Sequence, residues 1–324
     1  MSKKITVDIV DVSNWAHRAY FAARGMRAPD GTPTGVIKIL SSMLESLMAE
    51  NYKLNGRRGT YIACCMDVQT KETFRYAIQH DWVKNNRMRA DLVGMFGTEN
   101  KSKSPEYKGN RMKDPEKAEL MGIQMELLET LLPESGIPTF RRAPYEADDM
   151  IGSIAHQLED GYARIQSRDK DFAQLVKDGK TILIMPEQAN APRKEIDYAG
   201  CIREFGVKPY QIRYYLQLLG DSVDNIPGVP GVGPKTAVSL LNEFKTLGGI
   251  QRNKDKIKGK GRDRKLLRGE ERGLPPFDLT AELVKIKTDI EDIPTRAEDY
   301  QVGTPSKKFK KMIKKLGFKS LFGS

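Results

Sequence analysis

Apolar residues recur with two different periods in the first part of the chain. Residues 5–11 alternate apolar and polar side chains and lead into an apolar stretch, which predicts a buried strand that ends near Asp11. Residues 36–48 carry apolar side chains at helical spacing and predict an amphipathic helix. Residues 60–66 form a second apolar run, so another buried strand is predicted there.

The same alternation of strands and helices continues after residue 113. Asp114 and Pro115 are typical of an N-cap and a first helical position. The further predicted elements are a helix that Pro133 closes, a strand over 137–141, a helix that begins at Pro144, and strands over 162–166 and 181–185. Strands that alternate with helices favour an α/β fold, in which helices cover both faces of a mainly parallel sheet.

Two segments differ from this pattern and define the predicted domains. Residues 81–113 contain few aliphatic residues and many lysines and arginines, so we expect an exposed basic insertion. From residue 206 onward, helical segments flank a stretch rich in proline and glycine. We therefore predict an α/β domain over 1–205 and a helical region over 206–324. The latter would contain a solvated basic loop at 252–272 and a basic C-terminal helix that docks its apolar stripe on the protein body.

Charge and metal chemistry narrow the possible functions. The net charge of +11 and a pI near 9.3 favour a polyanionic partner, although a solvated lysine-rich surface is the alternative. The three cysteines and three histidines show neither a disulfide framework nor the spacing of a zinc site. A metal would therefore be a hard ion held by oxygen, namely Mg²⁺ or Mn²⁺. The chain has no signal-peptide pattern and no run of about 20 apolar residues, so we expect a cytoplasmic protein without membrane contact.

Carboxylates collect at the ends of predicted strands. Because the carboxyl ends of parallel strands meet at one edge, these acids are expected to converge there. A single acid at such a position is as readily a helix cap, but so many together would repel one another unless cations lie among them. Two metal ions about 4 Å apart could then clamp the attacking and leaving oxygens of a phosphate displacement. The acids concerned are Asp11, Asp67, Glu146, Asp148, Asp149, Asp169 and Asp171.

The segment GDSVDNIPGVPGVGPKTA, residues 220–237, predicts a phosphate-binding hairpin. Its glycines permit a tight turn before a helix that starts at Pro234. The N–H groups of Gly231, Val232 and Gly233 are expected to point at a phosphate, with Lys235 adding charge. An ordinary helix–loop–helix turn is the alternative. Two further acids, Asp221 and Asp224, precede the hairpin.

The segments YEADD, SRDKDFAQLV and GDSVDNIPGVPGVGPKTA, in this order and spacing, resemble the 5′-nuclease (flap endonuclease) family. The likeness is greatest to free-standing bacteriophage 5′-nucleases and to the 5′→3′ exonuclease domain of bacterial DNA polymerase I. It extends from Asp11 to about residue 240. The resemblance implies two Mg²⁺ ions, with Mn²⁺ as a substitute. The first metal group would be Asp11, Asp67, Glu146, Asp148 and Asp149, and the second Asp169, Asp171, Asp221 and Asp224.

The resemblance also implies roles for basic residues. The basic insertion would form an arch through which the 5′ single strand passes. Within it, Lys108 and Arg111 would contact the scissile phosphate and stabilise charge in the transition state, and Tyr107 would stack on a base. Arg18 matches a phosphate-binding arginine of the family. Arg168 departs from the pattern, because the family usually has glycine there, and it could add a phosphate contact or only change the loop.

Our hypothesis is a structure-specific 5′-nuclease that hydrolyses phosphodiester bonds of DNA flaps, 5′ ends and RNA primers in RNA–DNA hybrids, in replication or repair. The family further implies a monomer in a bacterial or phage-infected cell, associated with the nucleoid, with a single-strand-binding protein or replicative polymerase as protein partner. Two alternatives stay open. A PIN-type ribonuclease would share the acidic sheet edge, and a non-enzymatic branched-DNA-binding module would need only the hairpin and the basic patches.

Overall fold

The computed structural model describes residues 4–86, 108, 114–187, 191–224, 226–229, 231–257 and 277–323. By their internal contacts these residues form two units. Unit 1 takes 1–68, 114–196 and 287–324, and unit 2 takes 69–113 and 197–286. This division differs from a single boundary at residue 205, because the chain leaves unit 1 twice, after Val68 and after Ile196, and returns to it at Asp114 and at Lys287.

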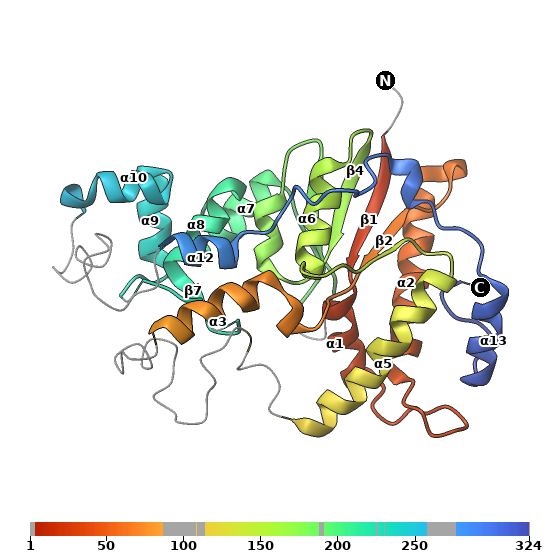
Figure 1. The fold of residues 1–324 in the computed structure, drawn as a ribbon. Coiled ribbons are helices and arrows are strands. Elements are labelled where there is room, and N and C mark those ends of the chain that lie inside the picture. Colours follow the sequence, from red (N-terminus) through yellow and green to blue (C-terminus); the bar gives the residue numbers. More distant parts are fainter. Residues whose placement is uncertain are drawn as a thin grey trace. The chain divides into compact units, whose positions relative to one another are not determined.

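Unit 1 is built on a six-stranded sheet in the order β3-β2-β1-β4-β5-β6, as Figure 1 shows for its central strands. The strands are β1 (Ile5–Asp11), β2 (Ile62–Cys65), β3 (Thr139–Phe140), β4 (Gly161–Gln166), β5 (Thr181–Met185) and β6 (Lys194–Ile196). All neighbouring pairs are parallel except β5 with β6. The predicted mainly parallel sheet is confirmed.

The register of the central strands brings three chain segments to one edge. Asp11 pairs with Cys65 of β2, and Val10 pairs with Gln166 of β4. The residues that follow β1, β2 and β4 therefore leave the sheet side by side. This is the edge where the sequence predicts the carboxylates.

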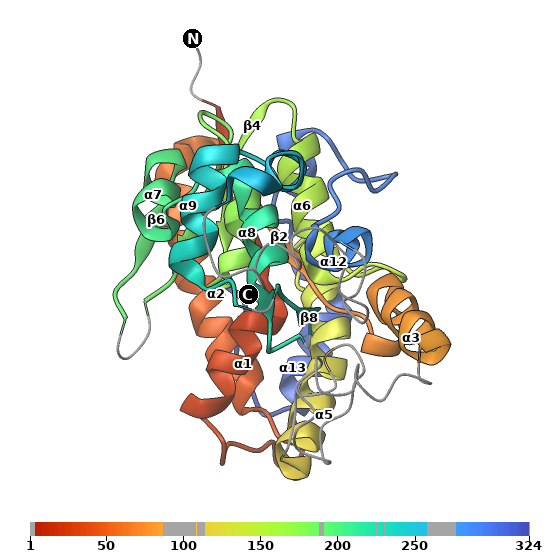
Figure 2. The same cartoon turned by 90° about the vertical axis from the view of Figure 1, so that its left-hand side faces the viewer.

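Helices cover both faces of this sheet. Figures 1 and 2 show α1, α2, α5 and α13 gathered on one face, and Figure 1 shows α6 across the strands from α2. Their bounds are α1 (Val12–Ala22), α2 (Gly35–Asn55), α5 (Pro115–Glu134), α6 (Ala147–Gln157) and α13 (Lys307–Lys315). The predicted docking of the C-terminal helix is confirmed, because Phe309 and Ile313 of α13 are buried in the same apolar cluster as α2 and α5.

Two predicted helix boundaries are wrong. Pro133 lies inside the last turn of α5, which continues to Glu134. The helix expected from Pro144 begins at Ala147 instead. Glu146 and Asp149 form a reciprocal capping box there, which satisfies free backbone N–H groups and fixes the start three residues later.

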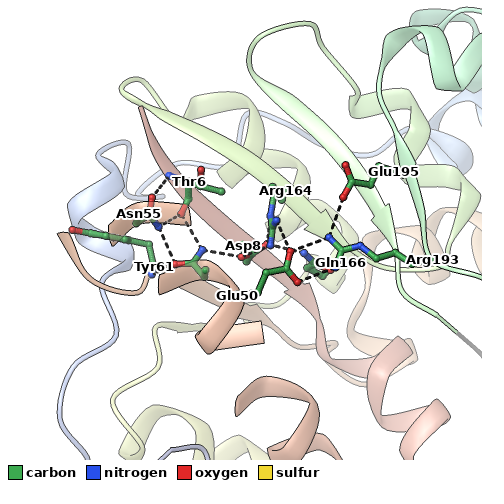
Figure 3. A network of polar contacts seen from close by, with 10 residues as sticks. Thr6, Asp8, Glu50, Asn55, Tyr61, Arg164, Gln166, Arg193 and Glu195 are labelled. Carbon is green, nitrogen blue, oxygen red and sulfur yellow. Dashed lines mark hydrogen bonds and ion pairs between the residues drawn. The ribbon is translucent and has the colours of Figure 1, made fainter. Parts of the chain in front are cut away.

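A buried polar network lies in the sheet, away from the acidic edge (Figure 3). Asp8 of β1 is fully buried, and both of its oxygens accept hydrogen bonds from Arg164 of β4, at 2.8 and 3.0 Å. Gln166 and Asn51 donate to the same carboxylate at 2.7 and 2.8 Å. Arg164 also donates to Glu50 of α2 at 2.7 Å. The network thus ties β1, β4 and α2 together through one charged pair.

Unit 2 is mainly helical. It contains α3 (Phe74–Asn86), α7 (Tyr198–Phe205), α8 (Ile212–Leu219), α9 (Pro234–Phe244), α10 (Leu247–Arg252) and α12 (Phe277–Val284), with a short hairpin of β7 (Gly220–Asp221) and β8 (Ile226–Pro227). The helix α3 was not predicted, and it occupies the first residues assigned to the basic insertion. Arg75 of α3 donates to the carbonyls of Leu283 and Lys285, which joins this helix to the end of α12.

Several predicted features fall partly outside the described residues. Within the insertion only 81–86 and Lys108 are described, and within the basic loop only 252–257. Among the helices of the described ranges, none combines the length and the apolar character needed to cross a bilayer.

Candidate active site

Asp11 lies at the centre of the acidic edge. It ends β1 and caps α1, with its carboxylate accepting hydrogen bonds from the Asn14 N–H and the Ser167 hydroxyl, both at 2.9 Å. Its side chain is almost fully buried, with 6% exposed. Burial, followed by the negative charges of Asp67 and Asp169, raises the pKa of Asp11 to about 7. The structure therefore places Asp67 and Asp169 within electrostatic reach of Asp11.

Asp67 and Asp148 approach this edge from β2 and α6. Asp67 accepts a hydrogen bond from the Ala147 N–H at 2.9 Å, which fixes the start of α6 against the end of β2. Burial raises the pKa of the Cys65 thiol well above its usual value, and the charges of Asp11, Asp148 and Asp67 are among the further causes. The charges of three separate carboxylates therefore act on the Cys65 thiol, so Asp148 belongs to the same acidic group.

Asp169 and Asp171 follow β4 in a tight turn. The Asp169 N–H donates to Ser167 Oγ at 3.1 Å, and the Asp171 N–H donates to Asp169 Oδ1 at 2.9 Å. Because Ser167 also donates to Asp11, one hydroxyl links the two strand ends. The short helix after Asp169 buries Phe172 in the core, so the turn has a fixed support.

Glu146 and Asp149 also have a structural role at the start of α6. Asp149 is fully buried, and its two oxygens accept from the N–H groups of Glu146 at 3.1 Å and Lys287 at 2.9 Å. The Glu146 side chain in turn accepts from the Asp149 N–H. Asp149 therefore starts α6 and binds the returning chain to it, and its place among the metal ligands stays a prediction.

The chemistry of the acidic edge suits a divalent cation, but its geometry is not that of a preformed site. Burial, and after it the nearby charges of Asp67 and Asp169, raises the pKa of Asp11, and carboxylates in such a cluster are hard oxygen ligands that a cation would stabilise. Within the part of the chain that the structure describes, no three side chains of His, Cys, Asp or Glu meet in an arrangement ready to hold a metal.

Asp11→Asn should make the metal-free protein more stable at alkaline pH. The raised pKa means that folded Asp11 binds its proton more tightly than the unfolded chain does, so its contribution to stability is lost as pH rises from about 4 through 7. We expect thermal unfolding in EDTA to show a melting temperature several degrees above wild type at pH 8, and nearly the same at pH 4. Asp292→Asn, at an exposed aspartate, is the control. Equal pH slopes for wild type and Asp11→Asn would contradict the assignment.

Asp221 and Asp224 belong to unit 2, where the structure brings Lys108 to them. Asp221 Oδ1 accepts from the N–H groups of Val223 and Asp224 at 2.7 and 3.2 Å, which closes the turn before β8. The Lys108 N–H donates to the Asp224 carbonyl at 3.2 Å. Lys108 has a φ of 55°, so this backbone bond holds it in a left-handed conformation beside the two acids. Tyr107 and Arg111 lie outside the described residues.

The glycine-rich hairpin has the predicted form, with one correction. A side chain at Gly228 would place its Cβ 2.2 Å from the Leu219 carbonyl, so only glycine fits where the hairpin crosses the end of α8. Gly231 has a φ of +84°, and Gly233 caps α9. The Val232 N–H donates to the Val229 carbonyl at 3.0 Å inside the turn, which removes it from the predicted phosphate contacts. Gly231, Gly233 and Lys235 are exposed, as the prediction requires.

Two arginines flank the acidic edge of unit 1. Arg18 of α1 donates to the Glu187 carbonyl at 2.6 Å, and Arg168, next to Asp169, donates to the Pro186 carbonyl at 2.6 Å. Sequence reasoning named Arg18 but left Arg168 open. The sequence does not reveal that these arginines are related, because they are 150 positions apart. They are brought together by their bonds to the segment that follows β5.

Comparison with known proteins agrees with this architecture. Residues 6–206 match the 5′-3′ exonuclease N-terminal resolvase-like domain, and residues 207–308 match the 5′-3′ exonuclease C-terminal SAM fold. A 5′-3′ exonuclease of Aquifex aeolicus is 31% identical over 98% of this chain and 93% of its own length. DNA polymerase I of Bacillus caldotenax is also 31% identical, over 99% of this chain and 32% of the polymerase.

Solved structures share the fold. The phage T5 5′-exonuclease with bound divalent metal ions (zinc) has a TM-score of 0.58 and 21% identity, over 97% of this chain and 100% of that one. The T5 flap endonuclease in a pseudo-enzyme-product complex with DNA and metal ions has a TM-score of 0.52 and 20% identity, over 86% and 87% of the two chains. The matches to the two family models and to the Aquifex exonuclease cover nearly the whole chain. They confirm the predicted enzyme class, and the protein belongs to the 5′-3′ exonuclease family of nucleases.

Proposed function

We propose that this chain is a metal-dependent, structure-specific 5′-nuclease. Its substrates would be DNA flaps, 5′ ends and RNA primers paired to DNA, in replication or repair. The observation that carries the proposal is the crowding of Asp11, Asp67 and Asp169 at one sheet edge, where burial and like charge raise the pKa of Asp11 to about 7. Such a cluster is costly without cations and is suited to phosphate chemistry once they bind.

The proposed ligands are the nine carboxylates that the sequence predicts. They are Asp11, Asp67, Glu146, Asp148, Asp149, Asp169, Asp171, Asp221 and Asp224. Two Mg²⁺ ions, or Mn²⁺ in their place, would supply Lewis-acid stabilisation of charge on the phosphate. The T5 proteins of the same fold, which were crystallised with metal ions, support a divalent metal at this edge.

The basic residues would orient the substrate. We propose that Lys108 and Arg111 contact the scissile phosphate and stabilise its charge in the transition state, while Tyr107 stacks on a base. The backbone bond from Lys108 to Asp224 supports the first of these roles, because it holds the lysine beside proposed metal ligands. Gly231, Gly233 and Lys235 would bind the backbone of duplex at the start of α9.

The direct test is cleavage of a 5′-labelled DNA flap and of a 5′-recessed RNA–DNA hybrid, each with Mg²⁺ and with EDTA. We expect a labelled fragment only with the metal, cut near the junction of the flap. Equal cleavage in EDTA would exclude metal dependence, and cleavage of the flap alone would remove RNA primers from the proposal.

The alternative of a non-enzymatic branched-DNA-binding module is disfavoured by the match to the 5′-3′ exonuclease family. The exposed hairpin and the net charge of +11 serve binding without any chemistry. Tight binding of the flap with no cleavage in Mg²⁺ or Mn²⁺ would favour this module. The PIN-type ribonuclease receives no such support, because the family match extends through residues 207–308.

A further inference from the structure

Arg18 and Arg168 form a pair of like charges beside the acidic edge. Both guanidinium groups bond to the short chain segment after β5, through the carbonyls of Glu187 and Pro186. Burial, and after it the positive charge of Arg168, lowers the pKa of Arg18. The two cations are therefore close enough to repel each other, and the carbonyl bonds hold them together.

Neither arginine is neutralised by an acid in the described part of the chain. Three other arginines of unit 1 pair with acids: Arg164 with Asp8, Arg193 with Glu50 and Arg296 with Asp160. Arg18 Nη1 is moreover buried without a hydrogen-bond partner among the described residues. A buried donor without an acceptor is unfavourable, which indicates an acceptor that binds from outside.

The position of the pair indicates which acceptor this is. Arg168 lies between Ser167, which donates to Asp11, and Asp169, and its own N–H donates to Asn14 of α1 at 3.4 Å. The pair is thus fixed to the backbone that carries two proposed metal ligands. Paired guanidiniums match the geometry and charge of a phosphate group. A phosphodiester held there would be a close neighbour of the one at the acidic edge.

We propose that Arg18 and Arg168 jointly bind one backbone phosphate of the strand that is cut, next to the scissile phosphate. The proposal deepens the proposed nuclease function and rests on it for the identity of the strand. It assigns a substrate contact to Arg168, at the position where the family pattern has glycine. The alternative is that Arg168 only fastens the loop to the Pro186 carbonyl.

The test is a scan of a 5′-flap DNA in which one phosphate at a time is replaced by a neutral methylphosphonate. Binding is measured in EDTA for wild type, Arg168→Gln and Arg168→Lys. We expect one position near the junction at which the replacement weakens wild-type binding about tenfold, as for a charge-assisted hydrogen bond. Arg168→Gln should bind the unmodified flap about tenfold more weakly and lose most of its sensitivity at that one position. Its salt slope should fall by about one.

Arg296→Gln is the matched control. It removes the same charge, but Arg296 pairs with Asp160 before the start of β4, at the opposite end of the strand from Arg168. This variant should keep the wild-type sensitivity at every phosphate. Arg168→Lys should retain part of the sensitivity, because it keeps the charge without the paired donors.

Two results would overturn the proposal. One is an Arg168→Gln scan that equals wild type at every position. The other is a uniform loss of affinity at all positions together with a lower melting temperature, which is the result of a role confined to the loop. Cleavage is assayed separately in Mg²⁺: an inactive wild type that keeps the position-specific effect refutes the nuclease and leaves the phosphate site.

Discussion

Asp148→Asn should reduce the turnover of a 5′-flap substrate in Mg²⁺ by about a thousandfold or more, and leave most of the binding intact. Asp148 belongs to the same acidic group as Asp11 and Asp67, because the charges of all three act on the Cys65 thiol. Removing one anionic ligand weakens the charge stabilisation that catalysis needs. Affinity for the flap should fall little, because contacts of Lys and Arg with phosphates supply most of it.

The neighbouring residue provides the control. Asp149→Asn exchanges a buried carboxylate that accepts two backbone N–H bonds for an amide that can accept only at one oxygen. We expect Asp149→Asn to lower the melting temperature and Asp148→Asn to leave it unchanged or raised. Measurements of kcat and of the melting temperature for both variants distinguish the effect of losing a metal ligand from the effect of losing a helix cap. An Asp148→Asn enzyme with wild-type turnover would exclude Asp148 from the metal site.

Arg164→Met should destabilise the fold by about 3–5 kcal/mol, because it leaves Asp8 buried without its cation. The side chains of this pair are only 7% and 0% exposed, and Arg164 also holds Glu50. Burial already raises the pKa of Asp8 in spite of the arginine, so removal of the arginine will make the charged carboxylate costlier still. Urea unfolding at pH 7 measures the loss, provided that the m-value is unchanged.

Two further variants test the cause of that loss. Adding Asp8→Asn to Arg164→Met removes the stranded charge and should restore most of the stability. Arg193→Met removes an arginine whose side chain is 38% exposed, at the rim of the same network, and should cost less than about 1 kcal/mol. Additive losses in the double variant would mean that the two side chains do not stabilise each other.

The described residues show how far local sequence patterns reach. The strand over 5–11 and the strand over 181–185 were predicted at their true positions, because apolar periodicity is set by which face of each segment is buried. Asp114 and Pro115 marked the start of α5 correctly, since a cap and a first-turn proline act within a few residues. The acids at strand ends and the motifs of the family were also found from residues that lie close together in the sequence.

The errors lie where a residue's role depends on distant chain. Pro144 has the local signature of a helix start, but the hydrogen bonds between Glu146 and Asp149 decided the boundary. The structural role of Asp149 also lies beyond local sequence, because one of its oxygens accepts a hydrogen bond from the Lys287 N–H, 138 residues further along. Nothing within a short window of sequence reports such a partner.

The sequence by itself therefore determined the order of the elements, the parallel sheet, the acid-rich edge and the family, all of which follow from local periodicity and from long motifs. Only the tertiary structure decided which carboxylates crowd together, that Asp149 serves the fold, and that Arg18 and Arg168 lie side by side. The physical reason is that burial and charge repulsion depend on distances between segments, and strand register and helix packing set those distances.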